Sequence, residues 1–496
     1  MNDTTDGYMA EIGYTSDYCP ELNPVRMRLA FLNAGLQSPE VATACELGCG
    51  QGVSIGIHAA ASTTQWFGND FNPAHIAFAR TLSEASGADV RLHGDSFVDF
   101  ADRSDLPDFD FIALHGIWSW ISDRNRAAIV KFVHRRLKPG GVLYISYNAL
   151  PGYTAIEPLR HLLVEHTGIA GNRGRPIVER MAAALDFAEE LLATKPAYSR
   201  ESPQIAERVA DLKGSDPRYL AHDYFNKDWR PLHFAAMVPW LADAELSYAC
   251  SARYIDAVDA VTLDNEQRAL LNEVEDPTFR QTVRDFMVNR RFRLDYWVKG
   301  TTTLSADDRA QALRRERVVL SARPPELPLK MRALLALNKA GPGEVATATI
   351  LAMLADGRPR AVGEIENALT GKDVTLDQIV EMVLLHVHYG CLTPTQDQAT
   401  AAKVRTATDR LNAHLIACAA SGSDVRSLAS PLTGGGIEVS RIKQRFLLAR
   451  REGKTHPDQW ATAALASSTH DIAELTKRAH DFAERELPLL ETLHVA

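Results

Sequence analysis

The stretch ACELGCGQG at residues 44–52 decides the fold of this chain. An apolar lead runs into an acid and then into three glycines, Gly48, Gly50 and Gly52, and an apolar helical pattern follows. This order predicts a strand, a tight turn and a helix, because glycine lets a backbone turn sharply and approach a ligand where a Cβ would not fit. By itself, such a turn is weak support for a nucleotide-type ligand.

Two carboxylates further along the chain support the nucleotide interpretation. Asp70 ends a second short strand, where its oxygens can accept hydrogen bonds from ribose hydroxyls, and Asp95 ends a third strand. The glycine turn and the two acids, in this order, resemble the cofactor site of the class I S-adenosylmethionine (SAM) methyltransferases. The resemblance implies that the glycines approach the amino-acid part of SAM, that Asp70 binds the ribose, and that Asp95 reads the adenine with Ser96.

The implied cofactor site is rich in acids, which suits SAM because SAM is a cation. Phe71 is expected to pack against the adenine ring, and His115, after a later strand, completes the site. The residues that the resemblance assigns to the cofactor are Glu46, Gly48, Gly50, Gly52, Asp70, Phe71, Asp95, Ser96 and His115.

Strands and helices alternate regularly after the glycine turn. Such alternation predicts a parallel, doubly wound α/β sheet whose ligands bind beyond the carboxyl ends of the strands. The predicted elements are strand 42–47, helix 53–61, strand 65–69, helix 73–86, strand 89–93, strand 109–114, helix 122–137, a turn at 138–141 and strand 141–147.

Two loops at these strand ends are rich in aromatic side chains. The first holds His115, Trp118 and Trp120, and the second runs over 148–153. Such side chains are costly to leave in water, so they form either a satellite core under a helix or an acceptor pocket with aromatic walls. The candidate catalytic residues are His115, Trp118, Trp120 and His222, although a lone histidine is more often structural.

Motifs along the chain resemble one group of class I methyltransferases, those that carry a methyltransferase regulatory domain. The group includes the rickettsial protein-lysine methyltransferases that modify outer-membrane proteins. The resemblance covers residues 14–153 and 215–300, with only scattered segments beyond, and Asp223 stands where glutamate is usual. The motifs are Tyr14-x-Ser16-x-Tyr18-x-Pro20, Glu46-Leu47-Gly48-Cys49-Gly50, His115-Gly116-x-x-Ser119-Trp120, Tyr147-Asn148-x-Leu150-Pro151-Gly152, His222-Asp223-Tyr224 and Ser430-Pro431-x-x-Gly434.

This resemblance implies methyl transfer to a protein side chain, in the first place a lysine amine. The amine must be neutral when it attacks, and aromatic walls would lower its pKa by desolvation and hold the cationic product by cation–π contact. His115 and His222 are candidate bases or orienting groups. Besides Trp118 and Trp120, the candidate substrate contacts are Tyr14, Tyr18, Tyr147, Asn148 and Tyr153.

We expect the sheet to be interrupted by helices and followed by a second domain. Residues 1–300 are predicted to form a Rossmann-like methyltransferase domain, with a lead or lid over 1–40, a helical insertion over about 154–220 and a regulatory or closing region over about 215–300 that completes seven strands. Residues 301–496 are predicted to be mainly helical, with a winged-helix-like outline. The helix in the recognition position has no lysine or arginine, which favours docking of substrate or partner over DNA binding.

The composition is that of a soluble globular protein. The 496 residues include 54 Lys plus Arg against 63 Asp plus Glu, and the formal net charge of -9 disfavours a nucleic-acid partner. Six scattered cysteines show no zinc-type pattern, so no metal site is expected. Cysteines that are few and unpatterned are typical of proteins of the reducing cytoplasm, where we expect this chain to be located. The polar N-terminus does not resemble a signal peptide, and no apolar run approaches the roughly 18 residues of a membrane span.

Three functions remain open from the sequence. The first is SAM-dependent methylation of a protein side chain, and the second is methylation of a small metabolite or peptide natural product on N, O or C. The third is a SAM-binding regulatory protein without turnover. The glycine turn and the acids favour SAM binding in all three, so they do not separate them. The oligomeric state does not follow from the sequence.

Overall fold

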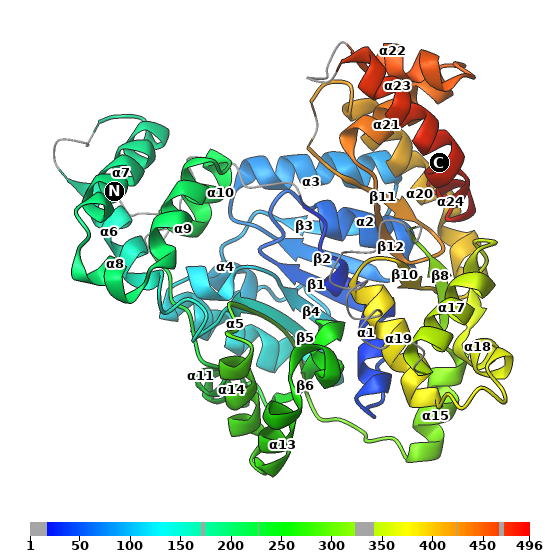
Figure 1. The fold of residues 1–496 in the computed structure, drawn as a ribbon, viewed down its shortest axis with the longest axis horizontal. Helices are drawn as coiled ribbons and strands as arrows, with labels where there is room; N and C mark the ends of the chain where they lie inside the picture. Colours follow the sequence, from blue (N-terminus) through cyan, green and yellow to red (C-terminus); the bar gives the residue numbers. More distant parts are fainter. Residues whose placement is uncertain (1–16, 170–173, 227, 323–341, 423, 466–470) are drawn as a thin grey trace.

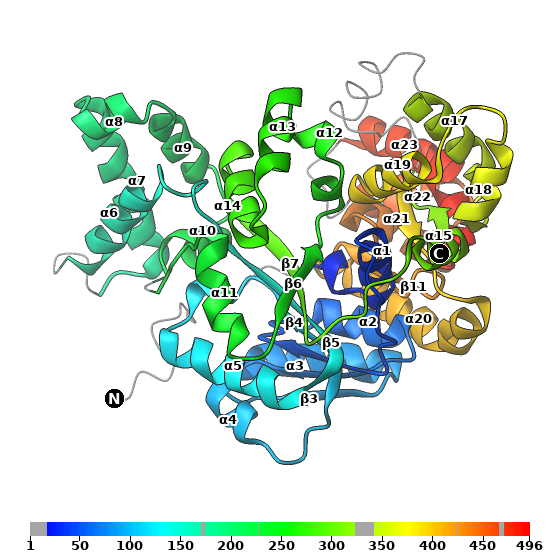
Figure 2. The same ribbon diagram turned by 90° about the horizontal axis from the view of Figure 1, so that it is seen from below.

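The computed structural model of the protein describes residues 17–169, 174–226, 228–322, 342–422, 424–465 and 471–496. A seven-stranded sheet lies at its centre, with a group of helices on one flank and the C-terminal region on the other (Figure 1, Figure 2). The strand order is β3-β2-β1-β4-β5-β7-β6, and only β7 runs antiparallel to its neighbours. This confirms the predicted Rossmann-like sheet. The strands are β1 Thr43–Leu47, β2 Gln65–Asn69, β3 Val90–His93, β4 Phe109–Leu114, β5 Leu137–Asn148, β6 Ser247–Ser251 and β7 Phe292–Val298.

Successive residues of the central strands point to opposite faces, so each strand contributes to two hydrophobic cores. Phe111 and Tyr144 join one core, whereas Ile112 and Leu143 join the other. The first core is covered by α2 Val53–Ala61 and α3 Pro73–Ser86. The second is covered by α4 Phe97–Asp102, α5 Asp123–Arg136 and α11 Phe234–Ala242.

One predicted turn is wrong. Residues 138–141, with their Pro-Gly-Gly sequence, belong to β5, which begins at Leu137. The register of β5 against β4 shifts between Phe109 and Phe111. Phe109 pairs with Leu137 and Phe111 with Val142, so residues 138–141 belong to the strand without regular partners in β4. The N–H of Gly140 also donates to the Lys299 carbonyl at 2.7 Å, which ties the segment to the residue that follows β7.

The insertion after β5 forms a helical group with its own core, which includes Leu163, Leu185, Val209 and Leu220. Its helices are α6 Glu157–Gly168, α7 Ile177–Ala193, α8 Ala197–Glu201, α9 Gln204–Lys213 and α10 Pro217–Tyr224. After α11 and β6 come a 3-10 turn η4 Tyr254–Ala257, α12 Asp259–Thr262, α13 Asn265–Glu273 and α14 Pro277–Met287, and β7 then completes the sheet.

Among the described residues, the C-terminal region begins with a three-stranded antiparallel sheet, ordered β10-β8-β9, and four helices, of which the last three stand where the winged-helix-like outline was expected. These elements are α15 Ala306–Arg315, β8 Arg317–Leu320, α17 Pro342–Leu354, β9 Arg360–Ala361, α18 Val362–Ala368, α19 Leu376–His388 and β10 Leu392–Pro394. The long helix α20 Gln398–Cys418 then packs along α2 and α3.

A hairpin and a group of helices end the chain. The hairpin pairs β11 Ser427–Ser430 with β12 Gly435–Glu438; of the three glycines predicted to form its turn, Gly434 lies in the turn and the other two begin β12. The helices are α21 Arg441–Arg451, α22 Pro457–Leu465, α23 Ile472–Asp481 and α24 Leu487–Thr492. No helix within the described part of the chain is both long and apolar enough to cross a membrane.

Candidate functional site

A cavity of about 990 Å³ lies at the carboxyl ends of β1, β2, β3 and β4. Cofactor and drug-sized ligands commonly occupy cavities of about 300–1,000 Å³. The loop after each of these strands supplies part of the wall, and the lead segment and α10 supply the rest. All nine residues assigned to the cofactor from the sequence line this one cavity: Glu46, Gly48, Gly50, Gly52, Asp70, Phe71, Asp95, Ser96 and His115.

The glycine turn after β1 adopts a conformation that side chains rarely allow. Gly48, Gly50 and Gly52 have φ values of +67°, +54° and +70°. A Cβ on Gly48 would lie 2.8 Å from the Ile117 side chain, and one on Gly52 would overlap the Ala79 side chain. A Cβ on Gly50 would meet no atom within 4 Å. Gly48 and Gly52 are therefore required by packing, whereas Gly50 keeps the turn open towards the cavity.

Asp70 ties the end of β2 to the glycine turn. Its Oδ2 accepts a hydrogen bond from the Gly50 N–H at 2.9 Å, and its Oδ1 accepts one from the Asn72 N–H at 2.9 Å. The Nδ1 of His75 lies 3.2 Å from the same Oδ1. The carboxylate thus holds the turn in place and still has lone pairs that can face a ligand.

Glu46, near the end of β1, presents a buried carboxylate to the cavity. Its Oε2 is shielded from solvent and has no hydrogen-bond partner among the described residues. Burial, with the nearby charge of Asp70, raises the pKa of the Glu46 carboxyl to about 8. A buried anion is unfavourable unless a cation pairs with it, so the Glu46 carboxylate fits a positively charged ligand such as SAM.

The loop after β3 meets the cavity with side chains that are already engaged. The Asp95 carboxylate forms an ion pair with Arg103 at 3.0 Å. The Ser96 hydroxyl caps α4, since it accepts a hydrogen bond from the Asp99 N–H at 3.2 Å and donates to the Asp99 carboxylate at 2.7 Å. Phe71, after β2, is half-buried in the same wall. This side of the cavity is therefore formed by a preorganised loop and the rings of Phe71 and Phe97.

His115, directly after β4, is held from behind by β5. Its Nδ1 lies 2.8 Å from the Tyr144 hydroxyl, and its ring is stacked on the Tyr144 ring. Burial lowers the pKa of His115, so the ring is uncharged at neutral pH. In the tautomer whose Nδ1–H donates to the Tyr144 oxygen, the other ring nitrogen, Nε2, can accept a proton from a ligand.

The two tryptophans after β4 have different surroundings. A 3-10 helix, which turns by about 120° per residue, spans Trp118–Trp120 and points the two rings in different directions. Trp120 lines the cavity together with His222 of α10. Trp118 is fully buried instead, with its ring edge-on to Trp240 at 5.7 Å between centroids. The satellite-core interpretation is therefore correct for Trp118, which does not reach the cavity.

Two predicted substrate contacts, Tyr147 and Asn148, are also buried and do not line the cavity. Alternation along β5 points Tyr147 to the core opposite the one that holds Tyr144, and its hydroxyl donates to the Asp295 carboxylate at 3.0 Å. The Asn148 N–H donates to the Ser119 hydroxyl oxygen at 2.8 Å. Both residues hold β5 to its neighbours and do not form the cavity wall.

Tyr153 lies in a second row of aromatic residues behind Trp120. Its ring meets Trp229 edge-on at 5.4 Å, and Trp229 lies 6.1 Å from Trp120 between ring centroids. The Arg160 guanidinium stacks over Trp229 at 4.6 Å. The aromatic wall predicted from the sequence therefore has one ring at the cavity and others behind it. Tyr14, the remaining tyrosine of the predicted wall apart from Tyr18, lies outside the described residues.

Tyr18 anchors the lead segment to the C-terminal hairpin and does not line the cavity. Its hydroxyl lies 2.9 Å from the His58 Nε2. A Cβ on Gly436 would lie 3.1 Å from the Tyr18 ring, and one on Gly435 would overlap the Tyr18 hydroxyl. Only glycine leaves this space for the ring. The flanking residues Asp17 and Cys19 line the cavity.

Several cavity residues were not singled out from the sequence, among them His75 and Asp223. His75 lies five residues after Asp70, in the first turn of α3, and its Nε2 has no hydrogen-bond partner among the described residues. The spacing of a histidine just inside the helix that follows the strand-end acid could have indicated it. Asp223 was treated only as a departure from a motif, although its neighbour His222 was proposed as a functional residue.

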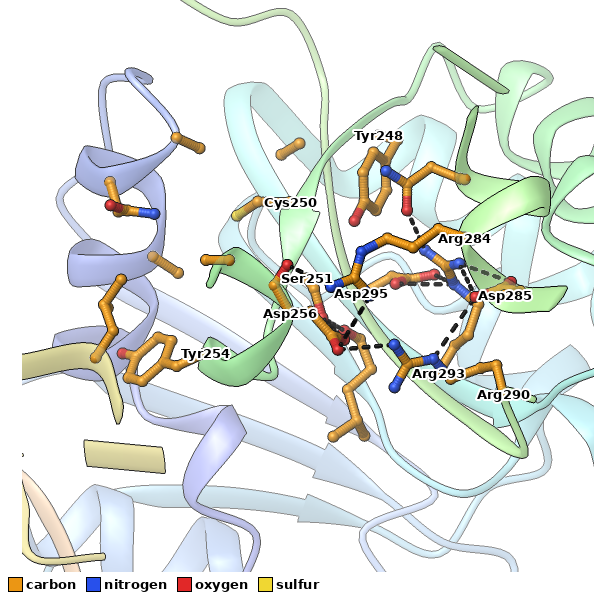
Figure 3. Close-up of a pocket in the computed structure, with 18 residues that line it drawn as sticks. Tyr248, Cys250, Ser251, Tyr254, Asp256, Arg284, Asp285, Arg290, Arg293 and Asp295 are labelled. Carbon is orange, nitrogen blue, oxygen red and sulfur yellow. Dashed lines mark hydrogen bonds and ion pairs between the residues drawn. The ribbon is translucent and has the colours of Figure 1, made fainter. Parts of the chain in front are cut away.

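A second cavity, of about 220 Å³, shares no lining residue with the first. Figure 3 shows the arginines and aspartates around it. Arg293 pairs with Asp285 and Asp295, both at 2.8 Å, and Arg290 pairs with Asp256 at 2.7 Å. These buried ion pairs join β7, α14 and η4. The residues around the second cavity therefore hold neighbouring elements to the sheet.

Comparison with known proteins adds family and fold. One family model, "Methyltransferase domain", matches residues 44–141, and another, "Predicted methyltransferase regulatory domain", matches residues 216–299. The uncharacterized protein sll1526 of Synechocystis sp. is 35% identical to this chain over 99% of each. The uncharacterized protein RP789 of Rickettsia prowazekii is 26% identical over 64% of this chain and 57% of that protein. The structure of PKMT2 from Rickettsia typhi in complex with AdoHcy has the same fold, with a TM-score of 0.67 at 16% identity over 97% of this chain and 99% of that one.

Proposed function

We propose that the methyl acceptor of this chain is an amine, in the first place a protein lysine side chain. The premise is the family: the chain belongs to the class I SAM-dependent methyltransferases that carry a methyltransferase regulatory domain. Membership of this family makes the chain a methyltransferase whose cofactor is SAM. SAM supplies a methyl group on a positively charged sulfur, and transfer of that group to an amine leaves the thioether AdoHcy. The motif resemblance to the rickettsial protein-lysine methyltransferases supports the choice of lysine.

The glycine turn and its neighbours would hold the methyl donor. Glu46 offers an unpartnered, buried carboxylate oxygen to a cation, and Gly50 leaves space where a side chain would intrude. Asp70 is fixed by the Gly50 and Asn72 N–H groups, so its remaining lone pairs can accept hydrogen bonds from ribose hydroxyls. These contacts support the roles expected for the three residues.

The observation that carries the proposal is that one cavity joins these donor groups to an uncharged histidine and an aromatic wall. An ammonium must lose a proton before its nitrogen can attack, and His115 is a neutral ring that can take it. Trp120 supplies an apolar face that lowers the pKa of a bound amine and holds the methylated cation. Walls of this kind also exclude water from the methyl group.

The contacts with the C-terminal hairpin suggest a function for residues 301–496. The hairpin β11–β12 encloses Tyr18, and the lead segment on either side of that residue reaches the cavity. The C-terminal domain would thus hold the lead in place over the donor site, in addition to any docking of a substrate. The same contacts support a lid role for the described part of the lead, residues 17–40, in the methyltransferase domain.

A small metabolite is the second candidate acceptor. Trp120 and His222 are only 8% and 4% exposed, so an acceptor must enter a recess. A compact amine fits such a recess as well as a single extended lysine side chain does.

Transfer of radiolabelled methyl from SAM into a lysate of the native cells, fractionated by size, tests the acceptor. We expect label in the protein fraction, methyl-lysine after acid hydrolysis, and suppression by excess AdoHcy. Label in the small-molecule fraction alone would favour the metabolite. A protein that binds SAM and labels neither fraction would be a regulatory SAM-binding protein.

A further inference from the structure

We propose that Asp223 is the carboxylate that binds the positively charged end of the acceptor, and that it selects amines over uncharged nucleophiles. The inference rests on the proposed function, because it names the group that recognises the acceptor of that reaction. Asp223 belongs to the helical insertion, outside the sheet that forms the donor end. It therefore gives the insertion a specific part in choosing the substrate.

Helix α10 carries Asp223 into the cavity. The helix begins at Pro217, and the Asp216 side chain caps it by accepting a hydrogen bond from the Arg218 N–H at 2.8 Å. Its last turn brings His222 and Asp223 to the cavity, which Trp120 also lines. The Arg160 guanidinium lies 5.6 Å from the centroid of the Trp120 ring and its charge acts on Asp223, so the carboxylate and the aromatic face lie at the same end of the cavity.

Among the described residues, one oxygen of the Asp223 carboxylate is left without a hydrogen-bond partner. This oxygen, Oδ2, is shielded from solvent. Burial raises the pKa of the Asp223 carboxyl to about 7, although the charges of Arg160 and Arg208 act in the opposite direction. A buried carboxylate oxygen without a donor lacks the partner that makes such burial favourable, and an ammonium would supply both charge and hydrogen bonds.

The two nearby arginines are committed elsewhere. The Arg160 guanidinium stacks over the rings of Trp229 and Trp120, at 4.6 Å and 5.6 Å from their centroids, and donates to the Asn226 carbonyl. Arg208 donates to the Tyr224 hydroxyl. Neither forms an ion pair with Asp223 in the described part of the chain, so both arginines shape the wall and the Asp223 charge remains for a ligand.

The site therefore fits a primary ammonium on an alkyl chain. The carboxylate recognises its charge, and the Trp120 face accommodates its methylene groups. An alcohol or a thiol of the same length would gain the apolar contact without the ion pair. The selection is one of chemical class and applies to a lysine side chain and to a small alkylamine alike.

Binding of n-butylammonium to the AdoHcy-saturated protein, followed by NMR titration, tests this assignment without turnover. The matched uncharged probe is 1-butanol. We expect Asp223→Asn to weaken n-butylammonium binding about tenfold or more, as the loss of a charge-assisted hydrogen bond implies. Binding of 1-butanol and of AdoHcy should not change. Asp223→Glu, which keeps the carboxylate, should keep most of the affinity, and Asp211→Asn, on the exposed surface of α9, should change nothing.

The pH profile gives a second reading of the same group. A neutral Asp223 carboxyl cannot pair with the ammonium, so affinity should rise as the pH increases through about 7 and level off above it. The profile should be flat in Asp223→Asn. The groups that face Asp223 are His222, Arg160, Arg208, Tyr153 and Tyr219. Burial lowers the pKa of Arg160 to about 10 and raises the pKa of Tyr153 to about 12, so neither group titrates near pH 7.

The assignment would be overturned by equal n-butylammonium affinity in the wild type and Asp223→Asn, or by no binding of n-butylammonium by the AdoHcy-bound wild type. Equal weakening of 1-butanol binding would also overturn it, because the variant would then have lost the shape of the site. Failure of the wild type to bind AdoHcy at all would contradict the proposed function itself, so the two failures are distinguishable.

Discussion

At the donor end of the cavity the side chains come from the last residues of the strands of the central sheet or from the turns that follow them, whereas the acceptor end takes its side chains from two separate parts of the chain. Glu46 pairs with Gly68 in the ladder between β1 and β2, and Asp70 directly follows β2, where the Gly50 and Asn72 N–H groups hold its carboxylate. At the acceptor end Trp120 comes from a loop and Asp223 from an inserted helix. The difference teaches that one sheet edge can keep a constant donor site while the acceptor is chosen by elements that vary independently of it.

Replacement of each of the two tryptophans should give the largest effects. One variant should lose mainly stability, and the other should lose mainly binding at the acceptor end. Trp118 is fully buried, so Trp118→Ala should lower the free energy of unfolding by about 3–5 kcal/mol through the cavity it leaves. Trp120 already borders a cavity, so Trp120→Ala should cost clearly less stability. It should instead weaken n-butylammonium binding about three- to tenfold through loss of the cation–π face.

Urea unfolding and the NMR titration described above measure the two effects. Equal stability losses, combined with unchanged binding in Trp120→Ala, would mean that the acceptor end is not where we place it.

Replacement of Glu46 should sharpen the donor end, because stability and affinity are expected to move in opposite directions. The pKa of Glu46 in the folded protein, about 8, lies above its ordinary value, so folding favours the protonated carboxyl. Its contribution to stability is therefore fully present below the unfolded pKa and is lost as the pH rises towards 8. Glu46→Gln should thus make the ligand-free protein about 1–3 kcal/mol more stable near pH 8.

The same variant should bind SAM about tenfold more weakly, since the carboxylate that pairs with a cation is gone. Thermal unfolding across pH 5–8 and calorimetry measure the two changes, with the exposed Glu179→Gln as control. Loss of stability in Glu46→Gln at pH 8, or unchanged SAM affinity, would show that Glu46 is satisfied by something other than the ligand.

Disruption of the hairpin should give the smallest effect and tests whether the C-terminal domain supports the donor end. A Cβ in Gly435→Ala would displace the Tyr18 hydroxyl, so the lead should loosen and SAM affinity should fall a few-fold. Amide hydrogen exchange over residues 19–22 should become faster. Gly343→Ala, at the start of α17, is the control in the same domain, because its backbone is not left-handed and its Cβ would make only an ordinary contact with the Met382 side chain. Unchanged exchange and affinity in a folded Gly435→Ala would separate the hairpin from the site.

The sequence predicted the donor end well because strand ends follow from local patterns. The glycines at 48, 50 and 52 and the acids at 70 and 95 are placed by the alternation of strand and helix alone, and all of them line one cavity. Side chains were harder to place where a shift of one residue along a helical turn or a strand changes the face to which the side chain points. Trp118 differs from Trp120 only by its position in a 3-10 turn, and Tyr147 differs from Tyr144 only by the parity of a strand.

Residues brought in from distant segments could not be placed from the sequence. Asp223 reaches the cavity because the insertion folds around its own core and returns beside the sheet, a packing outcome that no local pattern encodes. The contact of Tyr18 with a glycine hairpin more than 400 residues later has the same origin. Both motifs were recognised from the sequence, but their places were known only when the fold joined them.

Calorimetric titration of AdoHcy into a pair of matched glycine variants tests the donor site most directly. Gly50 and Gly140 both have positive φ, +54° and +78°, and in both a Cβ would meet no atom within 4 Å, but only Gly50 lines the cavity. Both substitutions should therefore cost similar backbone strain. We expect the wild type and Gly140→Ala to bind one AdoHcy with equal affinity and Gly50→Ala to bind it about a hundredfold more weakly. Equal affinity in all three proteins, or no binding by the wild type, would contradict a methyl-donor site at this turn.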